Sequence, residues 1–207
     1  DGSFVVTAEL SPPVSTDPTE FVGRALALRD LVTAINVTDG AGSKAHMSSL
    51  VAAHFLVRNG VEPILQMTCR DRNRIALQAE LLGAAALGIR NVLALRGDDP
   101  KLGDQPDAKP VFDLDTTALL ATAQQMRSEG LLPSGTEIKG PVRFVLGAAE
   151  LPVDPPAGWR PEGLLSKMKA GAEFILGGMY DFQIVDEVKI TLDGLKGGLV
   201  RQRQGLA

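Results

Sequence analysis

The stretch Asn91–Pro100, with the sequence NVLALRGDDP, constrains the fold of this chain more than any other feature. An apolar run rich in Val, Leu and Ala ends there in charged residues and glycine, as a strand of an α/β barrel does at the end that carries the chemistry. Three earlier runs repeat the pattern: Phe4–Ala8 before Glu9, Ala34–Val37 before Thr38-Asp39-Gly40, and Pro63–Met67 before Thr68-Cys69-Arg70-Asp71. Polar groups therefore recur at the same end of successive predicted strands.

Strand-like and helix-like segments alternate along the chain, with a recurrence of about 30 residues in its first half, the size of a βα unit. The predicted strands are Phe4–Glu9, Ala34–Thr38, Ile64–Cys69, Val92–Arg96, Arg143–Gly147 and Glu173–Leu176. The predicted helices are Thr19–Val32, Lys44–Arg58, Asn73–Leu87, Thr116–Ser128 and Pro161–Ala170. We expect Gly88 to end the third helix as a glycine cap. This order predicts parallel strands joined by right-handed crossovers, hence an α/β fold.

The composition excludes several classes of protein. The 207 residues are 44% hydrophobic and 4% aromatic with a net charge of −4, and the basic residues are scattered, so nucleic acid is not an expected partner. Cys69 is the single cysteine, and with two histidines it leaves no zinc ligand set, so no metal is expected. We expect Cys69 to be a buried structural thiol. No apolar run is long enough to span a bilayer, and no signal-peptide pattern begins the chain, which favours a cytoplasmic protein without membrane contact.

Five ordered motifs resemble the methylenetetrahydrofolate reductases, flavin-dependent (βα)8 barrels of the TIM type that reduce a folate-bound methylene group to methyl. They are Thr7–Pro13 (TAELSPP), Val37–Ala41 (VTDGA), Gln66–Asp71 (QMTCRD), Leu95–Asp98 (LRGD) and Lys167–Ala172 (KMKAGA). The similarity runs over about Phe4–Ile175, and the Leu-Arg-Gly-Asp strand end is its most distinctive part.

The resemblance implies two catalytic residues. Opening the five-membered ring of the folate needs a proton donor near a ring nitrogen, and a carboxyl group at a barrel mouth, away from bulk water, is suited to this. Glu9 is the candidate; the alternative is a glutamate that faces solvent or pairs with a lysine. Asp98, rather than Asp99, matches an aspartate beside the pterin and the flavin, where its charge can adjust the cofactor. For this pair the alternative is a turn carboxylate bound to backbone amides.

The resemblance also implies a set of FAD-binding residues, which comprises Thr38, Gln66, Arg96, Gly97, Asp98, Phe112 and Lys167. Glycine admits a close backbone approach, arginine can neutralise a pyrophosphate, and a threonine hydroxyl can bond the flavin edge. Gln66 stands where many relatives have histidine and keeps the capacity for hydrogen bonds. The alternative for Lys167 is a solvated lysine on a helix face, and the alternative for Phe112 is packing in the core.

The sequence also departs from the family. The glutamine that contacts folate after the sixth strand of relatives is absent, because Phe174-Ile175-Leu176 runs into Gly177-Gly178. The fifth strand lacks the tyrosine and histidine of many relatives. A closed eight-stranded barrel needs about 200–250 residues at the least, and two complete βα units cannot follow Leu176. We therefore expect residues 1–176 to form a reductase-type barrel segment and residues 177–207 an atypical segment. Three explanations stay open: a fragment, missing segments, or an open barrel completed by another chain.

The function expected from the resemblance is reduction of 5,10-methylenetetrahydrofolate to 5-methyltetrahydrofolate, with FAD as cofactor and NADH or NADPH as electron donor. Folate is then the small-molecule partner, and a homo-oligomer or a partner subunit would cover the open edge. Two alternatives remain. The truncated C-terminal part and the lost glutamine suggest a non-catalytic barrel that serves as a binding or assembly subunit. A pterin-dependent methyltransferase barrel would use the acidic strand ends without a flavin.

Overall fold

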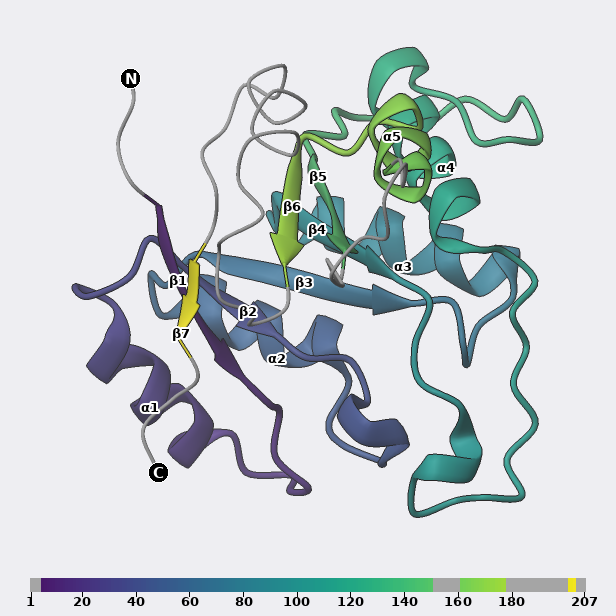
Figure 1. The fold of residues 1–207 in the computed structure, drawn as a ribbon. Coiled ribbons are helices and arrows are strands. Elements are labelled where there is room, and N and C mark those ends of the chain that lie inside the picture. Colours follow the sequence, from purple (N-terminus) through teal and green to yellow (C-terminus); the bar gives the residue numbers. More distant parts are fainter. Residues whose placement is uncertain (1–4, 151–160, 178–200, 204–207) are drawn as a thin grey trace.

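The computed structural model of the protein describes residues 5–150, 161–177 and 201–203 (Figure 1). Its strands are β1 (Val6–Leu10), β2 (Ala34–Val37), β3 (Pro63–Thr68), β4 (Asn91–Leu95), β5 (Val145–Glu150), β6 (Phe174–Gly177) and β7 (Arg201–Arg203). Its helices are α1 (Thr19–Leu28), α2 (Ser49–Arg58), α3 (Arg74–Ala86), α4 (Thr116–Glu129) and α5 (Glu162–Lys169), with short 3-10 turns at Ala41–Ser43 and Pro100–Leu102.

The strands form one sheet in the order β6-β5-β4-β3-β2-β1-β7, and every described pair is parallel. Strands β1 to β6 follow the chain in sequence, and the sheet curls into a half-barrel (Figure 1). The predicted α/β barrel architecture is thereby confirmed, with the described strands forming a half-barrel. Parallel strands must be joined by crossovers, and here helices supply those between β1 and β6.

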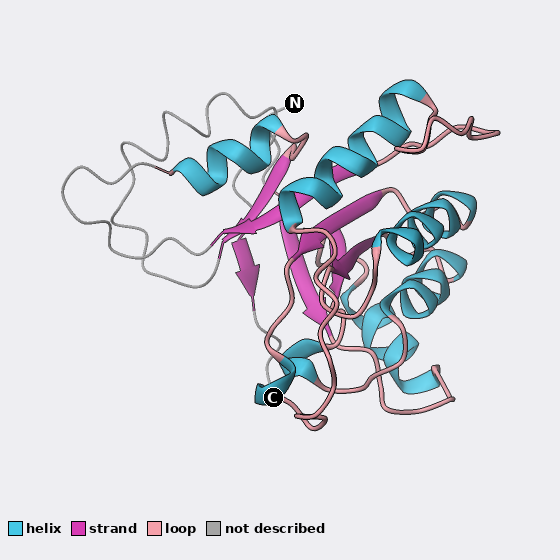
Figure 2. Ribbon diagram, turned by 90° about the vertical axis from the view of Figure 1, so that its right-hand side faces the viewer, coloured by secondary structure: helices cyan, strands magenta, loops and turns pink. Residues whose placement is uncertain are grey.

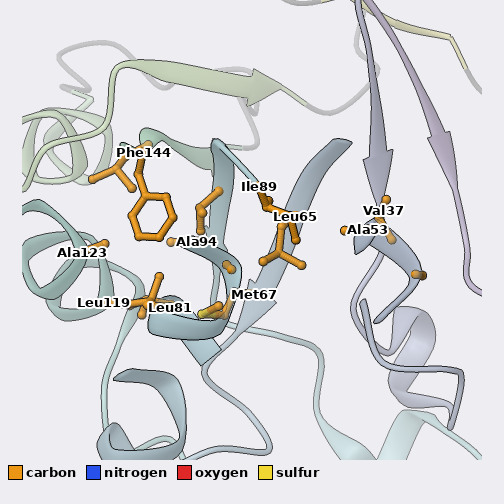
Figure 3. Packing of buried hydrophobic residues seen from close by; sticks show 14 of the residues in the cluster. Val37, Ala53, Leu65, Met67, Leu81, Ile89, Ala94, Leu119, Ala123 and Phe144 are labelled. Carbon is orange, nitrogen blue, oxygen red and sulfur yellow. The ribbon is translucent and has the colours of Figure 1, made fainter. Parts of the chain in front are cut away.

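Alternation along the strands divides the core into two unequal parts. The larger cluster lies between the sheet and the helices, where residues such as Val37, Leu65 and Ala94 pack against Ala53, Leu81 and Leu119 (Figure 3). A smaller cluster, on the opposite face of the strands, joins Ala34, Ile64, Leu93 and Leu176. Figure 2 shows the helices outside the strands. The smaller cluster therefore fills the inner face of the half-barrel.

The inner face becomes polar toward the carboxyl ends of the strands. On β3 the inner position after Ile64 is Gln66, and the register pairs Glu9 of β1 with Asn36 of β2. Asn36 and Gln66 are both buried. The inner face is thus apolar at the smaller core cluster and polar at Glu9, Asn36 and Gln66, which we call the floor. The loops that follow the strands surround this floor.

Two predicted helices are shorter in the structure. The first ends at Leu28 instead of Val32, because the amides of Leu31 and Val32 turn back to the Leu28 carbonyl and the chain then joins the sheet. The second begins at Ser49 instead of Lys44. The amide of Met47, within the predicted first turn, instead donates to the carbonyl of Pro13 at 2.9 Å.

The other predicted elements lie within two residues of the observed ones, except that β5 ends at Glu150, three residues beyond the predicted end at Gly147. Gly88 has a φ of 78° after α3, as a glycine cap requires. The sequence also allows a strand at Ile184–Leu192, and this segment lies outside the described residues. Within the described part of the chain, no helix has the length and apolar character needed to cross a membrane.

Candidate active site

A cavity of about 510 Å³ opens at the carboxyl ends of the strands. It is lined by residues of β1, β3, β4 and β5, of the loops after β2, β3 and β4, and of α4 and α5. Of the residues expected at the site, it is lined by Glu9, Thr38, Gln66, Arg96, Gly97, Asp98 and Lys167. These come together because parallel strands end at one edge of the sheet, where loops build the sites of α/β barrels.

Glu9 lies at the floor of the cavity and is held by two amide side chains. Its Oε2 accepts hydrogen bonds from Asn36 Nδ2 at 2.8 Å and from Gln66 Nε2 at 3.2 Å. The Oε1 atom of Gln66 faces the backbone N–H of Asp39 at 3.4 Å. Since a backbone N–H can only donate, this contact fixes which end of the Gln66 amide faces Glu9. Glu9 is therefore not free in solvent, and among the described residues it is not paired with a lysine.

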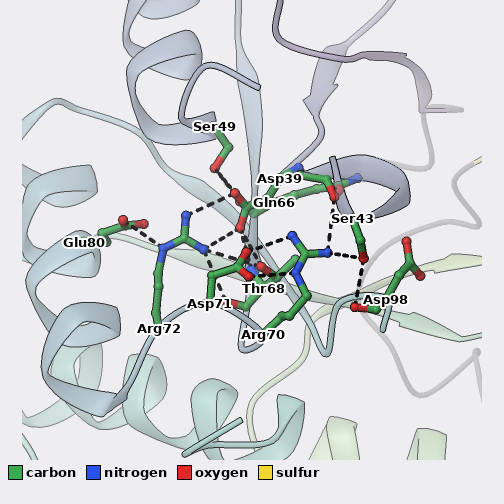
Figure 4. Close-up of polar contacts among 11 residues, drawn as sticks. Asp39, Ser43, Ser49, Gln66, Thr68, Arg70, Asp71, Arg72, Glu80 and Asp98 are labelled. Atoms are coloured by element: carbon green, nitrogen blue, oxygen red, sulfur yellow. Dashed lines mark hydrogen bonds and ion pairs between the residues drawn. The ribbon is translucent and has the colours of Figure 1, made fainter. Parts of the chain in front are cut away.

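Asp39 is the centre of a buried ion-pair network beside the floor (Figure 4). Its carboxylate accepts from Arg72 at 2.7 and 3.1 Å, from the backbone and hydroxyl of Thr68 at 2.8 and 3.0 Å, and from Ser49 at 3.1 Å. Burial alone would raise the pKa of Asp39, but the bonds and charge of Arg72, with those from Thr68, outweigh burial and lower it. Arg72 also bonds Glu80 of α3 at 2.9 Å. Asp39 is thus an ionised anchor for the loop after β2.

Arg70 connects the loops that surround the cavity (Figure 4). It is 5% exposed and donates to Ser43 Oγ at 2.9 Å, while Ser43 Oγ donates to the carbonyl of Asp98 at 3.1 Å. The carboxylate of Asp71 accepts two hydrogen bonds of 2.8 Å from the same guanidinium. Gly97, with a φ of 89°, lies so near that a Cβ there would be 2.9 Å from Arg70 Cβ. These contacts position the backbone that carries Asp98, whose side chain is exposed at the cavity.

Arg96 and Phe112 form a cation–π pair at the outer part of the site. The guanidinium carbon of Arg96 lies 4.2 Å from the centre of the Phe112 ring. Phe112 is partly buried against the larger core cluster and is not among the residues that line the cavity. In this structure Phe112 supports Arg96 and packs against the core. Core packing is the alternative that the sequence allowed for Phe112.

Lys167 of α5 lies at the wall formed by β5. Its Nζ donates to the carboxylate of Glu150 at 2.6 Å and to the carbonyl of Ala149 at 2.7 Å. The lysine is therefore not a solvated side chain on a helix face. The sequence pattern does not predict Glu150 as this partner, because the contact joins the end of β5 to a helix that follows the intervening residues 151–160.

Other expected features are also placed by the fold. The Thr38 hydroxyl donates to Ser11 Oγ at 3.0 Å, so its donor is engaged within the protein. Cys69 is buried, and burial raises the pKa of its thiol to about 11, as a structural role predicts. His46 precedes α2 and contacts the Pro12 carbonyl, whereas His54 lies within α2. Within the described ranges no cluster of three metal-ligating side chains is found.

Asn36, Asp39 and Arg72 had no assigned role in the sequence analysis. Asp39 carried a usable signal, since it lies two residues beyond the buried strand β2, as Asp98 lies three residues beyond β4. Asn36 lies inside an otherwise apolar strand, where a buried amide needs a polar partner. Arg72 gives no signal of its own, because only the fold shows that it reaches Asp39.

Comparison with known proteins agrees with the motifs. The family model described as methylenetetrahydrofolate reductase matches residues 1–130. A probable methylenetetrahydrofolate reductase (NADPH) of Caenorhabditis elegans is 44% identical over 57 residues, which are 28% of this chain and 9% of that protein. A 5,10-methylenetetrahydrofolate reductase of Pectobacterium carotovorum subsp. carotovorum is 28% identical over 123 residues, which are 58% of this chain and 40% of that protein. The match thus spans less than half the length of these relatives.

Among solved structures, 2,3-dimethylmalate lyase, a member of the PEP mutase/isocitrate lyase superfamily, matches with a TM-score of 0.54. The match covers 96% of this chain and 65% of that one at 14% identity, so it supports the TIM-like fold alone. The family model, in contrast, covers more than half of this chain and includes the strand ends that carry Glu9, Gln66 and Asp98. By this match, the chain belongs to the methylenetetrahydrofolate reductase family.

Proposed function

We propose that the protein is a flavin-dependent oxidoreductase that reduces 5,10-methylenetetrahydrofolate to 5-methyltetrahydrofolate with electrons from NADH or NADPH. The observation that carries the proposal is the position of Glu9. Its carboxyl group is bound by two amides and lines a cavity on the face where α/β barrels hold their active sites, and Asp98 and Arg96 line the same cavity.

The lining residues suit a flavin. The floor offers the amide of Gln66, and the outer part offers the cations Arg96 and Lys167, so a polar heterocycle and an anionic tail each find complementary groups. Gly40 and Gly97 bring backbone to the cavity without side chains. A bound flavin supplies the hydride chemistry that side chains of a protein cannot perform. Arg96, Gly97, Gln66 and Lys167 are the residues proposed to hold it.

Glu9 is proposed as the general acid. Both amide donors contact Oε2, so Oε1 is the oxygen left to carry a proton toward a substrate nitrogen. Gln66 and Asn36 restrict the carboxyl group to one orientation, and the buried network of Asp39 holds Gln66 in place. Such positioning is what general acid catalysis needs, since the proton must reach hydrogen-bond distance of the accepting atom.

Asp98 is proposed to bind the amino-pyrimidine edge of the pterin. It is an exposed carboxylate at the cavity, and its backbone is fixed by Ser43. A carboxylate can accept two N–H bonds from such an edge, which orients the ring relative to Glu9. The folate contact made by glutamine in relatives is absent, so Asp98 has a larger share of substrate binding in this proposal.

Reconstitution with FAD tests the function directly. We expect the purified full chain to bind FAD with a perturbed flavin spectrum, to bleach under anaerobic NADH or NADPH, and to regain colour on addition of methylenetetrahydrofolate with formation of 5-methyltetrahydrofolate. A protein that binds folate but no flavin would favour the methyltransferase alternative. One that binds neither would favour a binding or assembly subunit.

A further inference from the structure

The ion pair between Lys167 and Glu150 occupies a position in the cavity where an anionic ligand would need the lysine. The two side chains are 20% and 28% exposed, and their charged atoms are 2.6 Å apart. A second bond from Lys167 Nζ to the Ala149 carbonyl holds the ammonium group against β5. Both residues line the cavity. The lysine is therefore preorganised, but its charge is already neutralised by a carboxylate.

The other described cations of the lining, Arg70 and Arg96, differ in their availability to a ligand. Arg70 is bound by Asp71 on two nitrogens and by Ser43, and only 5% of it is exposed. Arg96 is exposed and, among the described residues, contacts the Phe112 ring and no carboxylate. Among the described residues, a ligand phosphate in this cavity thus meets one exposed cation without a carboxylate partner, Arg96, and one that is shared with Glu150, Lys167.

We propose, on the basis of the flavin site above, that Glu150 is a specificity-determining residue that weakens the binding of flavins in proportion to their phosphate charge. A phosphate that binds Lys167 must displace the Glu150 carboxylate or share the lysine with it. FMN and FAD lose binding free energy in this way, whereas riboflavin, which has no phosphate, does not. The preference of the cavity for FAD over riboflavin is consequently smaller than it would be if Lys167 had no carboxylate partner.

The physical basis is the cost of placing like charges together in a partly buried site. Removing the carboxylate eliminates its repulsion of the phosphate and also frees Lys167, whose charge is then uncompensated. Glutamine keeps the shape and hydrogen-bonding capacity of glutamate, so Glu150→Gln changes mainly the charge. We expect about fivefold tighter binding of FAD and FMN, and a riboflavin affinity that stays within about twofold.

The test is a comparison of three flavins with matched variants of the full chain. Dissociation constants of riboflavin, FMN and FAD are measured by quenching of flavin fluorescence for the wild type, Glu150→Gln, Lys167→Met and the double variant. Lys167→Met is expected to weaken FMN and FAD and to spare riboflavin. In the Lys167→Met background, Glu150→Gln should tighten FAD less than it does in the wild type, because there is no lysine to free.

Two controls lie on the same helix outside the cavity lining. Glu162 and Lys169 of α5 are exposed, so Glu162→Gln and Lys169→Met change the same charges without altering the proposed contact. Neither should change the ratio of FAD to riboflavin affinity. The proposal is overturned if Glu150→Gln leaves that ratio unchanged, or if Glu162→Gln changes it equally. If no flavin binds to any variant, the proposed function itself fails; if all bind with unaltered ratios, the flavin site stands and the role of Glu150 does not.

Discussion

Glu9 is the residue on which the proposed chemistry depends most. Proton donation is needed only when the methylene group is reduced, so the Glu9→Gln variant should retain flavin reduction by the nicotinamide and lose at least about 100-fold in transfer to folate. Glutamine can still bond Asn36, which limits disturbance of the floor. Stopped-flow absorbance of the two half-reactions measures both rates.

Glu20→Gln is the matched control, because Glu20 is an exposed glutamate in the first turn of α1, away from the cavity. It should leave both half-reactions unchanged. Equal losses in the two half-reactions of Glu9→Gln would instead assign Glu9 a structural role.

Asp39 supports the floor through charge, and this support should depend on pH. Its pKa in the folded protein lies below the ordinary value of 3.8, so its contribution to stability is complete above that pH and is lost as the pH falls through the lowered pKa. The Asp39→Asn variant leaves Arg72 buried, with Glu80 as its remaining carboxylate partner among the described residues. We expect the free energy of unfolding to fall by about 3 kcal/mol at pH 7, and the difference from the wild type to shrink below pH 3.8.

Urea unfolding at pH 7 and at acidic pH measures this difference. Asp113→Asn is the control, because Asp113 pairs with Arg74, whose side chain is 59% exposed. Its effect at pH 7 should be much smaller than that of Asp39→Asn. A difference for Asp39→Asn that is equal at every pH would show that its effect is not due to charge.

At the scale of single residues, the sequence predicted which side chains reach the cavity better than it predicted what they contact. Glu9 and Asp98 could be placed because each lies near or just beyond the carboxyl end of a parallel strand, whereas Gln66 was placed through the family resemblance. The partners of Lys167 and Asp39 could not be predicted, because Glu150 and Arg72 reach them only through the packing of separate elements. Local pattern carries no information on such contacts.

Among the secondary-structure elements, β5 and β6 illustrate how one glycine permits close approach. Gly147 of β5 pairs with Phe174 of β6, and a Cβ at Gly147 would overlap the Phe174 ring. The Gly147→Ala variant should therefore lose about 2 kcal/mol of unfolding free energy through overpacking. Adding Phe174→Leu should recover part of this loss, since the smaller side chain leaves room for the methyl group.

Gly23 offers a control of opposite sign. It lies inside α1 with nothing within 4 Å of the position of a Cβ, so Gly23→Ala should stabilise the protein by about 1 kcal/mol. Thermal or urea unfolding of both variants measures the contrast. If Gly147→Ala proves as stable as the wild type, β5 and β6 separate more easily than their register implies.

The start of α2 shows why element boundaries are less predictable than element types. The apolar spacing from Met47 onward continues the helical pattern. However, the backbone amide of Met47 donates to the carbonyl of Pro13 in the loop after β1, so the segment 44–48 lies against that loop. Gly40 and Gly42 both have positive φ and turn the chain toward the cavity before the helix begins. A tertiary contact therefore overrides local periodicity at this boundary.

At the scale of the whole molecule, the cavity connects segments that are far apart in the sequence. Its lining extends from Glu9 to Lys167, and Ser43 and Arg70 join the loops after β2, β3 and β4. The amide of Val111, near the far end of the loop after β4, donates to the Arg70 carbonyl at 2.7 Å. The alternation of strands and helices predicted this architecture, but the linkage between loops depends on side chains that the pattern does not distinguish.

Because one cavity contacts so many segments, a ligand that fills it should stabilise the whole described domain. Free FAD at about 100 times its dissociation constant should add about 2.7 kcal/mol to the free energy of unfolding. For a chain of this size that corresponds to a rise of roughly 5–10 °C in Tm. Thermal unfolding followed by circular dichroism, with and without FAD, measures the shift.

ADP at the same concentration is the control, since it shares the adenosine diphosphate but lacks the isoalloxazine ring. An equal rise with ADP would place the interaction at the adenosine diphosphate part of FAD alone, whereas a rise with FAD only requires that the flavin part itself contributes to binding.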